Sequence, residues 1–160
     1  MATIEKTIDV DVPVSVAYDQ WTQFEEFPQF MSHIVEVRQI DDRRTRWVAE
    51  VGGERKEWEA EIVEQEPDRV IAWRSTGGTR NSGRVAFEPT DSGTRISVAM
   101  EYEPEGMKES VGAAVGLDGS QVEGDLERFR DLVEGREVPT GAWRGRIESG
   151  EVVEDDSAAR

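Results

Sequence analysis

The chain has 160 residues and is strongly acidic, with 35 Asp and Glu against 19 Lys and Arg and a formal net charge of −16. Nucleic acids and anionic membranes bind proteins through Lys and Arg side chains that neutralise phosphates, so this composition argues against both as partners. The chain has no cysteine, which excludes disulfides, thiolate metal sites and a cysteine nucleophile.

No targeting or membrane signal is visible in the sequence. The first six residues have neither the basic stretch nor the apolar stretch of a secretory signal peptide. No apolar run approaches the roughly 20 residues of a membrane-spanning helix. We therefore expect a cytoplasmic protein that does not insert into a membrane. One domain is expected over residues 1–136, followed by a partly disordered extension over residues 137–160.

The first predicted elements are one strand and two short helices. Apolar residues at even positions from Ile4 to Val12 predict a strand over residues 3–12. Helical spacing of apolar residues then predicts a short helix over residues 14–23. Pro28 interrupts the chain that follows, so residues 25–31 are expected to form a second short helix. Its inward side chains would be Phe24, Phe27, Phe30 and Met31.

The apolar period changes to two between His33 and Glu103, which predicts six further strands. In the segments around Trp47 and Trp58, apolar residues occupy one face and mostly charged residues the other. Such alternation is typical of an antiparallel sheet with one face in water. The expected strands cover residues 34–40, 45–51, 56–64, 70–75, 84–88 and 94–102.

Helical periodicity returns after Pro104. An apolar stripe of Val122, Leu126, Phe129 and Val133 predicts a long C-terminal helix. The segment before this stripe, residues 107–120, is rich in small residues.

Apolar periodicity is lost after Arg136, which leaves Trp143 and Ile147 as isolated anchors. The acidic run over residues 151–156 is too polar to pack and is expected to be disordered.

Several motifs occur along the chain in a fixed order. They are IDVDVPVSVAYDQWTQFEEFPQFM at residues 8–31, WVAEV from Trp47, WEAEI from Trp58, IAWRS from Ile71, NSGRVAF at residues 81–87, VEGDLERF at residues 122–129 and TGAWRG at residues 140–145. With the order of elements, they make the chain resemble the START-like or Bet v1-like (SRPBCC) superfamily, in its bacterial polyketide cyclase/dehydrase-like branch. The resemblance covers residues 1–145.

The resemblance implies an α+β helix-grip fold. A seven-stranded antiparallel sheet would wrap around the long C-terminal helix, with two short helices after the first strand. It also implies a cavity between sheet and helix, which relatives use for lipids, sterols, polyketides or quinones. The residues allow a cavity by themselves, because small helix residues leave space opposite aromatic strand residues. Its expected lining is Trp47, Trp58, Trp73, Phe87, Met100, Tyr102, Tyr18, Phe27, Asn81, Gly112, Gly116 and Leu126.

Some polar residues have two interpretations. Tyr102 shares the inward position of Met100, so its hydroxyl needs a buried partner or a ligand. Asn81 either orients a ligand or forms an Asx-type turn. His33, the single histidine, stands at a helix–strand junction and is expected to be a junction or surface residue. One histidine without cysteine makes a metal site unexpected, and no cofactor is predicted.

Three functions remain open from the sequence. The favoured one is non-covalent binding or carriage of an apolar or aromatic small molecule. The first alternative is an aromatase/cyclase-type enzyme acting on a poly-β-keto chain, with Tyr18, Tyr102, Arg74 or Arg84 as the polar groups. The second is an interaction or stress-response module whose cavity is filled. The sequence leaves the oligomeric state, the ligand and any reaction open.

Overall fold

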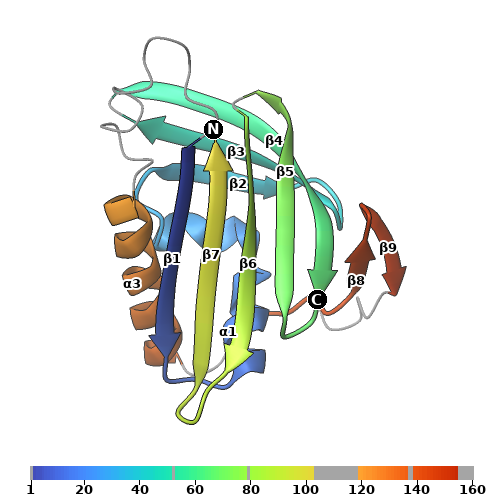
Figure 1. Ribbon diagram of the computed structural model, residues 1–160. Helices are drawn as coiled ribbons and strands as arrows, with labels where there is room; N and C mark the ends of the chain where they lie inside the picture. The colour runs from blue at the N-terminus through green and yellow to red at the C-terminus, as the bar shows by residue number, and fades with distance from the viewer. Residues whose placement is uncertain (1, 52, 79, 103–118, 137–138, 155–160) are drawn as a thin grey trace.

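The computed structural model describes the chain except for residues 1, 52, 79, 103–118, 137–138 and 155–160. A curved antiparallel sheet forms its frame (Figure 1). The main strands lie in the spatial order β1-β7-β6-β5-β4-β3-β2. Each strand from β2 to β7 therefore pairs with the next one in the sequence, and β1 pairs with β7. Their bounds are β1 (Ala2–Val10), β2 (Ile34–Gln39), β3 (Arg44–Val51), β4 (Glu54–Glu66), β5 (Val70–Gly78), β6 (Asn81–Pro89) and β7 (Thr94–Tyr102).

The helices lie together on one side of the sheet, which we call the inner face (Figure 1). They are α1 (Val14–Trp21), the 3-10 helix η1 (Phe24–Gln29) and the long α3 (Gly119–Arg136). Pro13 begins α1 because its carbonyl accepts the backbone N–H groups of Val16 and Ala17, at 3.0 and 3.1 Å. Pro28 lies inside η1, and because proline has no backbone N–H it cannot donate a hydrogen bond that would extend the helix. The predicted helix-grip α+β fold is confirmed.

The sheet has two strands more than the seven that the sequence predicts. Strand β8 (Arg146–Glu148) pairs with β4, where Ile147 lies opposite Gln65, and β9 (Glu151–Glu154) pairs with β8. The turn between them uses positive φ at Ser149 and Gly150, and the Gly150 N–H donates to the Val63 carbonyl at 3.0 Å.

The expectation of disorder from residue 151 onward is therefore wrong for residues 151–154. Backbone pairing holds this acidic strand in place, while the Glu151 side chain remains exposed. The anchors Trp143 and Ile147 are buried in the same core as the elements before Arg136, at 2% and 0% exposure. The other residues of the acidic run, 155–156, lie outside the described part of the chain.

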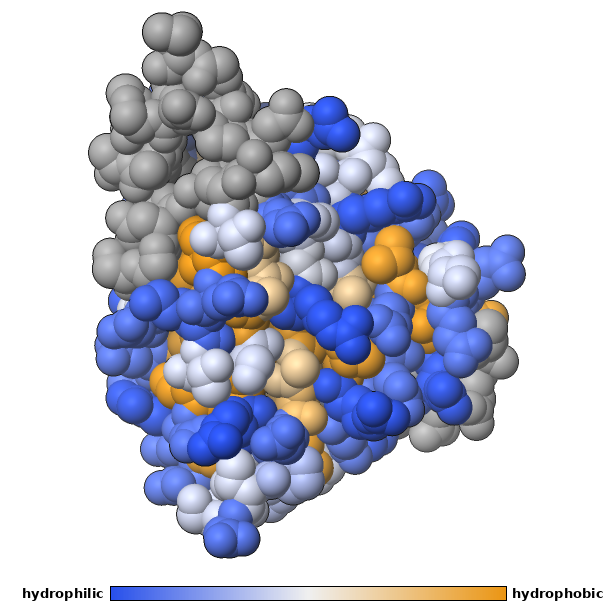
Figure 2. All heavy atoms as spheres, viewed as in Figure 1, coloured by the Kyte–Doolittle hydropathy of each residue, from blue (hydrophilic) through white to orange (hydrophobic). Residues whose placement is uncertain are grey.

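The opposite side of the sheet, the outer face, is covered with paired charges. Figure 2 shows this face, where hydrophilic side chains surround small apolar patches. Cross-strand ion pairs include Arg46 with Glu57, Arg84 with Glu64, and Arg95 with Asp9. In the described residues, no helix is long and apolar enough to cross a membrane.

Candidate functional site

Aromatic side chains fill the part of the inner face that lies beneath α1, η1 and α3. The Trp21 ring meets Phe129 of α3 at 4.8 Å between centroids and Phe27 of η1 at 5.5 Å. Phe30 also contacts Phe129, at 5.1 Å, in an edge-to-face arrangement. All four rings are at most 5% exposed. This part of the inner face is therefore a packed core.

The core continues into a pair of stacked indoles on β3 and β4. Trp47 and Trp58 are direct cross-strand partners, and their rings are nearly parallel, with centroids 5.8 Å apart and an interplanar angle of 9°. The Trp47 Nε1–H donates to Thr45 Oγ1 at 2.8 Å, while the Trp47 ring contacts Phe27 at 5.6 Å. Both indoles stay partly exposed, so their stack is an apolar surface as well as a part of the core.

A third indole lies across the neighbouring strand. Trp73 of β5 is the partner of Gly83 on β6, and a Cβ at Gly83 would lie 2.5 Å from two atoms of the Trp73 ring. The indole can lie there only because glycine has no side chain. The Trp73 Nε1–H donates to Asn81 Oδ1 at 3.1 Å, and the Asn81 N–H donates to Ser75 Oγ at 3.0 Å. These bonds hold the ring flat over β6.

The three indoles and Met100 share the inner face in two groups. In the register, Trp47 lies opposite Trp58, while Trp73 lies opposite Gly83 and Gly83 opposite Met100. The partner of Trp73 on β4 is Ile62, four residues after Trp58. Each of these four apolar side chains is partly exposed, in contrast to the buried core beside it. We call Trp47, Trp58, Trp73 and Met100 the inner aromatic surface. Asn81 lies at its edge.

Four of the other residues expected to line a cavity are buried in the core. Phe87, Phe27 and Leu126 are 5%, 2% and 3% exposed, and Tyr18 is fully buried. The Tyr18 hydroxyl accepts a hydrogen bond from Gln65 Nε2 at 2.9 Å, and burial raises the pKa of this phenol well above its usual value. Tyr18 is thus placed as a structural group and is poorly suited to exchange protons with a ligand.

Three expected lining residues cannot be placed as side chains. Tyr102 ends β7 opposite Asn81, which brings its backbone to the edge of the inner aromatic surface. Gly112 and Gly116, which the sequence suggests as the source of space, lie outside the described residues. The prediction of space beside the helix therefore remains a prediction.

Sequence reasoning missed a polar cluster formed by the C-terminal segment. The Arg144 guanidinium lies 2.7 Å from the carboxylate of Asp68, pairs with Asp19, and sits over the Tyr18 ring at 5.6 Å. Burial raises the pKa of Asp19, and Arg144 opposes that shift. The motif TGAWRG was visible in the sequence, but only as a mark of family resemblance. In the structure it ties the C-terminal segment to α1 and to the β4–β5 turn.

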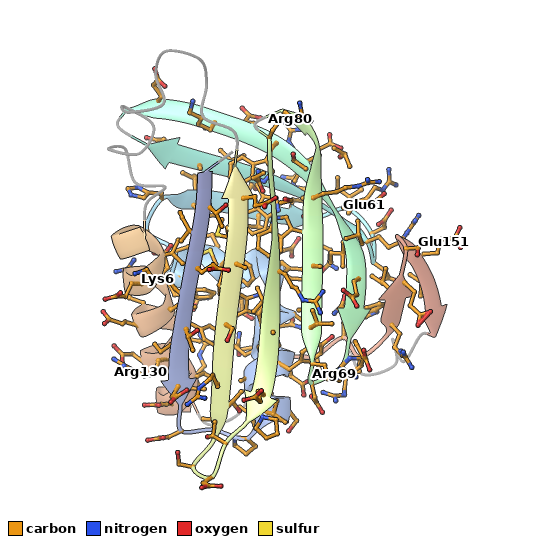
Figure 3. All side chains as sticks on the ribbon, viewed as in Figure 1. Lys6, Glu61, Arg69, Arg80, Arg130 and Glu151 are labelled. Atoms are coloured by element: carbon orange, nitrogen blue, oxygen red, sulfur yellow. The ribbon has the colours of Figure 1, made fainter. Side chains whose placement is uncertain are left out.

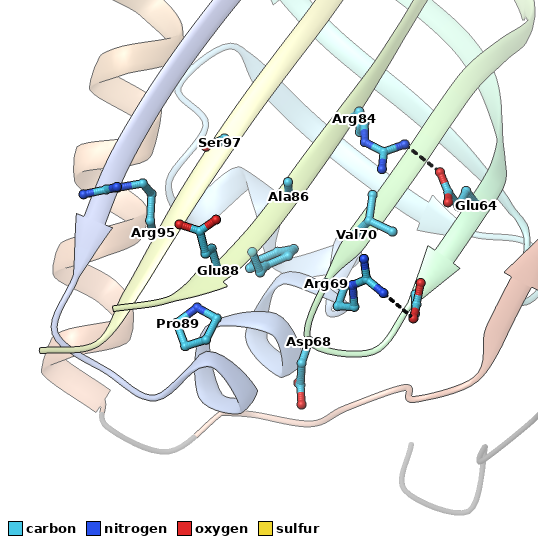
Figure 4. Close-up of a pocket in the computed structure, with 12 residues that line it drawn as sticks. Glu64, Asp68, Arg69, Val70, Arg84, Ala86, Glu88, Pro89, Arg95 and Ser97 are labelled. Carbon is cyan, nitrogen blue, oxygen red and sulfur yellow. Dashed lines mark hydrogen bonds and ion pairs between the residues drawn. The ribbon is translucent and has the colours of Figure 1, made fainter. Parts of the chain in front are cut away.

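A hollow of about 480 Å³ opens on the outer face, away from the inner aromatic surface (Figure 4). Its floor contains Val70, Ala86 and Ser97, and the remaining lining is largely charged. Arg84 pairs with Glu64 there at 2.7 Å (Figure 4). Charges at the rim make this hollow a poor match for an apolar guest, so we place the candidate site on the inner face.

The structure also locates the other groups considered from the sequence. Arg74 and Arg84 are both exposed and pair with Glu61 and Glu64, so neither points to the inner aromatic surface. His33 is partly buried, and its carbonyl accepts the Glu50 N–H at 2.9 Å. Within the described ranges, no group of three or more His, Cys, Asp or Glu side chains could hold a metal ion.

Comparisons with known proteins agree with this architecture. Residues 10–130 match the family model described as polyketide cyclase / dehydrase and lipid transport. The chain is 44% identical over 149 residues to an uncharacterised 17.2 kDa protein of Streptomyces lincolnensis, covering 92% of this chain and 99% of that protein.

Two solved structures share the fold at lower identity. A START superfamily protein from Mycobacterium smegmatis is 17% identical with a TM-score of 0.66, over 84% of this chain and 98% of that one. The Zhui aromatase/cyclase from a Streptomyces species is 17% identical with a TM-score of 0.70, over 84% and 96%. These two structures show a shared fold, while the family model confirms the polyketide cyclase/dehydrase-like resemblance seen in the sequence.

Proposed function

Because the chain belongs to the polyketide cyclase/dehydrase and lipid transport family, we propose that it binds an apolar small molecule non-covalently on the inner aromatic surface. One observation carries this proposal. Three indoles on the concave side of the sheet stay partly exposed, although the core immediately beside them is closely packed. Ligand sites are lined mainly by apolar and aromatic side chains, and these indoles are large apolar side chains that remain accessible.

The flatness of these walls favours a flat guest. Trp47 and Trp58 are nearly parallel to each other, and Trp73 is fixed flat over Gly83. Apolar burial contributes about 25 cal/mol per Å², so covering about 250 Å² would contribute about 6 kcal/mol before the entropic cost of binding. The expected dissociation constant is therefore micromolar or weaker.

The enzyme alternative finds less support among the described residues. Tyr18 is buried and bonded to Gln65, and the two arginines considered as catalytic groups are exposed on the outer face. A cyclase would need polar groups beside the folded substrate. Asn81 is the polar residue that we place at the edge of the surface, and its side-chain oxygen already accepts the Trp73 N–H. Binding without chemistry is the function that this arrangement supports best.

A fluorescence titration tests the proposal. N-phenylnaphthylamine, a neutral flat probe, should bind and take up excitation energy from the nearby indoles. Trp58→Ala removes one wall and should weaken binding about ten-fold, the order expected for a lost aromatic contact with its buried area. Ile40→Ser is the matched control, because Ile40 is 46% exposed and follows β2, away from the inner aromatic surface.

Two outcomes would contradict the proposal. If the probe does not bind the wild-type protein, the inner aromatic surface is not a ligand site. The alternative function, an interaction module, would then be the better-supported one. If Trp58→Ala and Ile40→Ser weaken binding equally, the probe is binding to exposed apolar residues in general.

A further inference from the structure

The N–H groups of the three indoles on the inner aromatic surface have different partners. The Trp47 Nε1–H donates to Thr45 Oγ1 at 2.8 Å, and the Trp73 Nε1–H donates to Asn81 Oδ1 at 3.1 Å. The Trp58 Nε1–H has no acceptor among the described residues, and its nitrogen is accessible to solvent. Trp58 is therefore the indole of this surface that can donate a hydrogen bond to a ligand.

The strand register explains why Trp58 keeps an unused donor. Its cross-strand neighbour on β3 is Trp47, and an indole offers one N–H donor and no acceptor. Its neighbour on β5 is Gly78, which has no side chain. Glu61 of β4 lies on the opposite face from Trp58 and pairs with Arg74 at 3.4 Å (Figure 3).

This donor makes the surface selective for the polarity of a ligand's edge. A ring that covers Trp58 takes its N–H out of water, and a donor buried without an acceptor weakens binding. A ligand whose edge carries an acceptor oxygen replaces the lost water and avoids that cost. Trp47 and Trp73 impose no such requirement, because their N–H groups stay bonded to Thr45 and Asn81.

We propose that Trp58 determines specificity through its N–H, so that the preferred ligand is a flat aromatic molecule with a carbonyl oxygen at its edge. The rings of this ligand cover the inner aromatic surface, and the oxygen accepts the Trp58 N–H. This inference rests on the proposed function, because it names the polar group of the ligand that binds at the same surface.

The test uses two neutral, flat probes that differ at one position. Fluorenone has a carbonyl group where fluorene has a methylene group, and equilibrium dialysis measures the affinity of each. Trp58→Phe keeps an aromatic ring and removes the N–H. It should lower the preference for fluorenone over fluorene about five-fold, the size expected for one hydrogen bond between neutral groups.

Trp47→Phe is the matched control. It removes an indole N–H from the same stacked pair, but this N–H is already bonded to Thr45. Any change that it causes in affinity should therefore be the same for both probes, and the preference for fluorenone should stay at the wild-type value.

A second measurement uses the wild-type protein and does not depend on the folding of a variant. In spectra of protein with ¹⁵N-labelled tryptophan, the Trp58 indole proton should lie at higher frequency in the fluorenone complex than in the fluorene complex, because it then donates to a carbonyl. The Trp47 and Trp73 indole protons keep their partners, so their signals should differ little between the two complexes.

The outcomes separate this inference from the proposed function. If neither fluorene nor fluorenone binds, the proposed function fails and this inference fails with it. If both bind, the proposed function stands. An unchanged preference in Trp58→Phe, an equal loss of preference in Trp47→Phe, or the same Trp58 indole signal in both complexes would then show that Trp58 does not select the ligand.

Discussion

Replacing Gly83 by alanine should destabilise the protein, although the same change in an open strand position is usually harmless. The added Cβ would lie 2.5 Å from Cη2 and from Cζ2 of Trp73, and 3.0 Å from the Ala99 carbonyl oxygen. The indole is rigid, so the whole ring must move. That movement breaks its hydrogen bond to Asn81.

The expected loss follows from three contributions. Overpacking of this kind costs about 1–3 kcal/mol. The lost hydrogen bond costs about 1 kcal/mol. A lower entropy of the unfolded chain returns about 0.4–1 kcal/mol. We therefore expect Gly83→Ala to lower the free energy of unfolding by about 2 kcal/mol.

Urea denaturation followed by tryptophan fluorescence measures this loss. Gly77→Ala is the matched control on the adjacent strand, because in the described part of the chain a Cβ there meets no heavy atom within 4 Å. It should leave stability unchanged or slightly raised. Equal stability of the two variants would refute the placement of Trp73 over Gly83.

Two further changes test the core. Phe129→Ala should lower the free energy of unfolding by about 3–5 kcal/mol, because the ring is fully buried against Trp21 and Phe30. Calorimetry measures this loss. A loss below about 1 kcal/mol would mean that the packing of α3 on the sheet does not stabilise the fold as described. Burial raises the pKa of Tyr18, so its phenol stays protonated in the folded protein. An unfolded tyrosine ionises near pH 10. Unfolding above that pH therefore releases a proton, and the free energy of unfolding should fall as pH rises. Urea titrations between about pH 8 and 11 should show this slope in the wild type and a shallower one in Tyr18→Phe; identical slopes would mean that the phenol is not buried as described.

Much of the fold follows from local patterns in the sequence. The alternation around Trp47 and Trp58 predicts their shared face, and the register pairs them directly. The stripe through Leu126, Phe129 and Val133 predicts the buried side of α3, and all three are at most 3% exposed. Patterns of this kind are readable because one side of each element must exclude water.

Other features depend on contacts between distant segments and leave no local pattern. A bulge between Ile62 and Glu64 interrupts the alternation of β4, so Gln65 turns inward and reaches Tyr18. The role of Gly83 depends on a side chain that is missing, which no periodicity can reveal. Short acidic strands such as β9 resemble a disordered tail until their pairing partner is known.

The candidate site was only partly accessible from the sequence. The expectation that inward-facing aromatic residues line the site selected Trp47, Trp58 and Trp73. It also selected Tyr18 and Phe87, whose rings pack against each other in the core with centroids 5.4 Å apart. Alternation tells which face a residue occupies and not how far along that face the helices cover it. Only the tertiary arrangement separates the covered part from the exposed part.

The five indole N–H groups allow the most direct test of ligand binding on the inner aromatic surface. Nuclear magnetic resonance spectra of protein with ¹⁵N-labelled tryptophan should show a separate indole signal for each ring. On addition of N-phenylnaphthylamine, the signals of Trp47, Trp58 and Trp73 should shift, while those of the buried Trp21 and Trp143 should stay in place. Unchanged signals from the first three, or equal shifts of all five, would contradict binding at this surface.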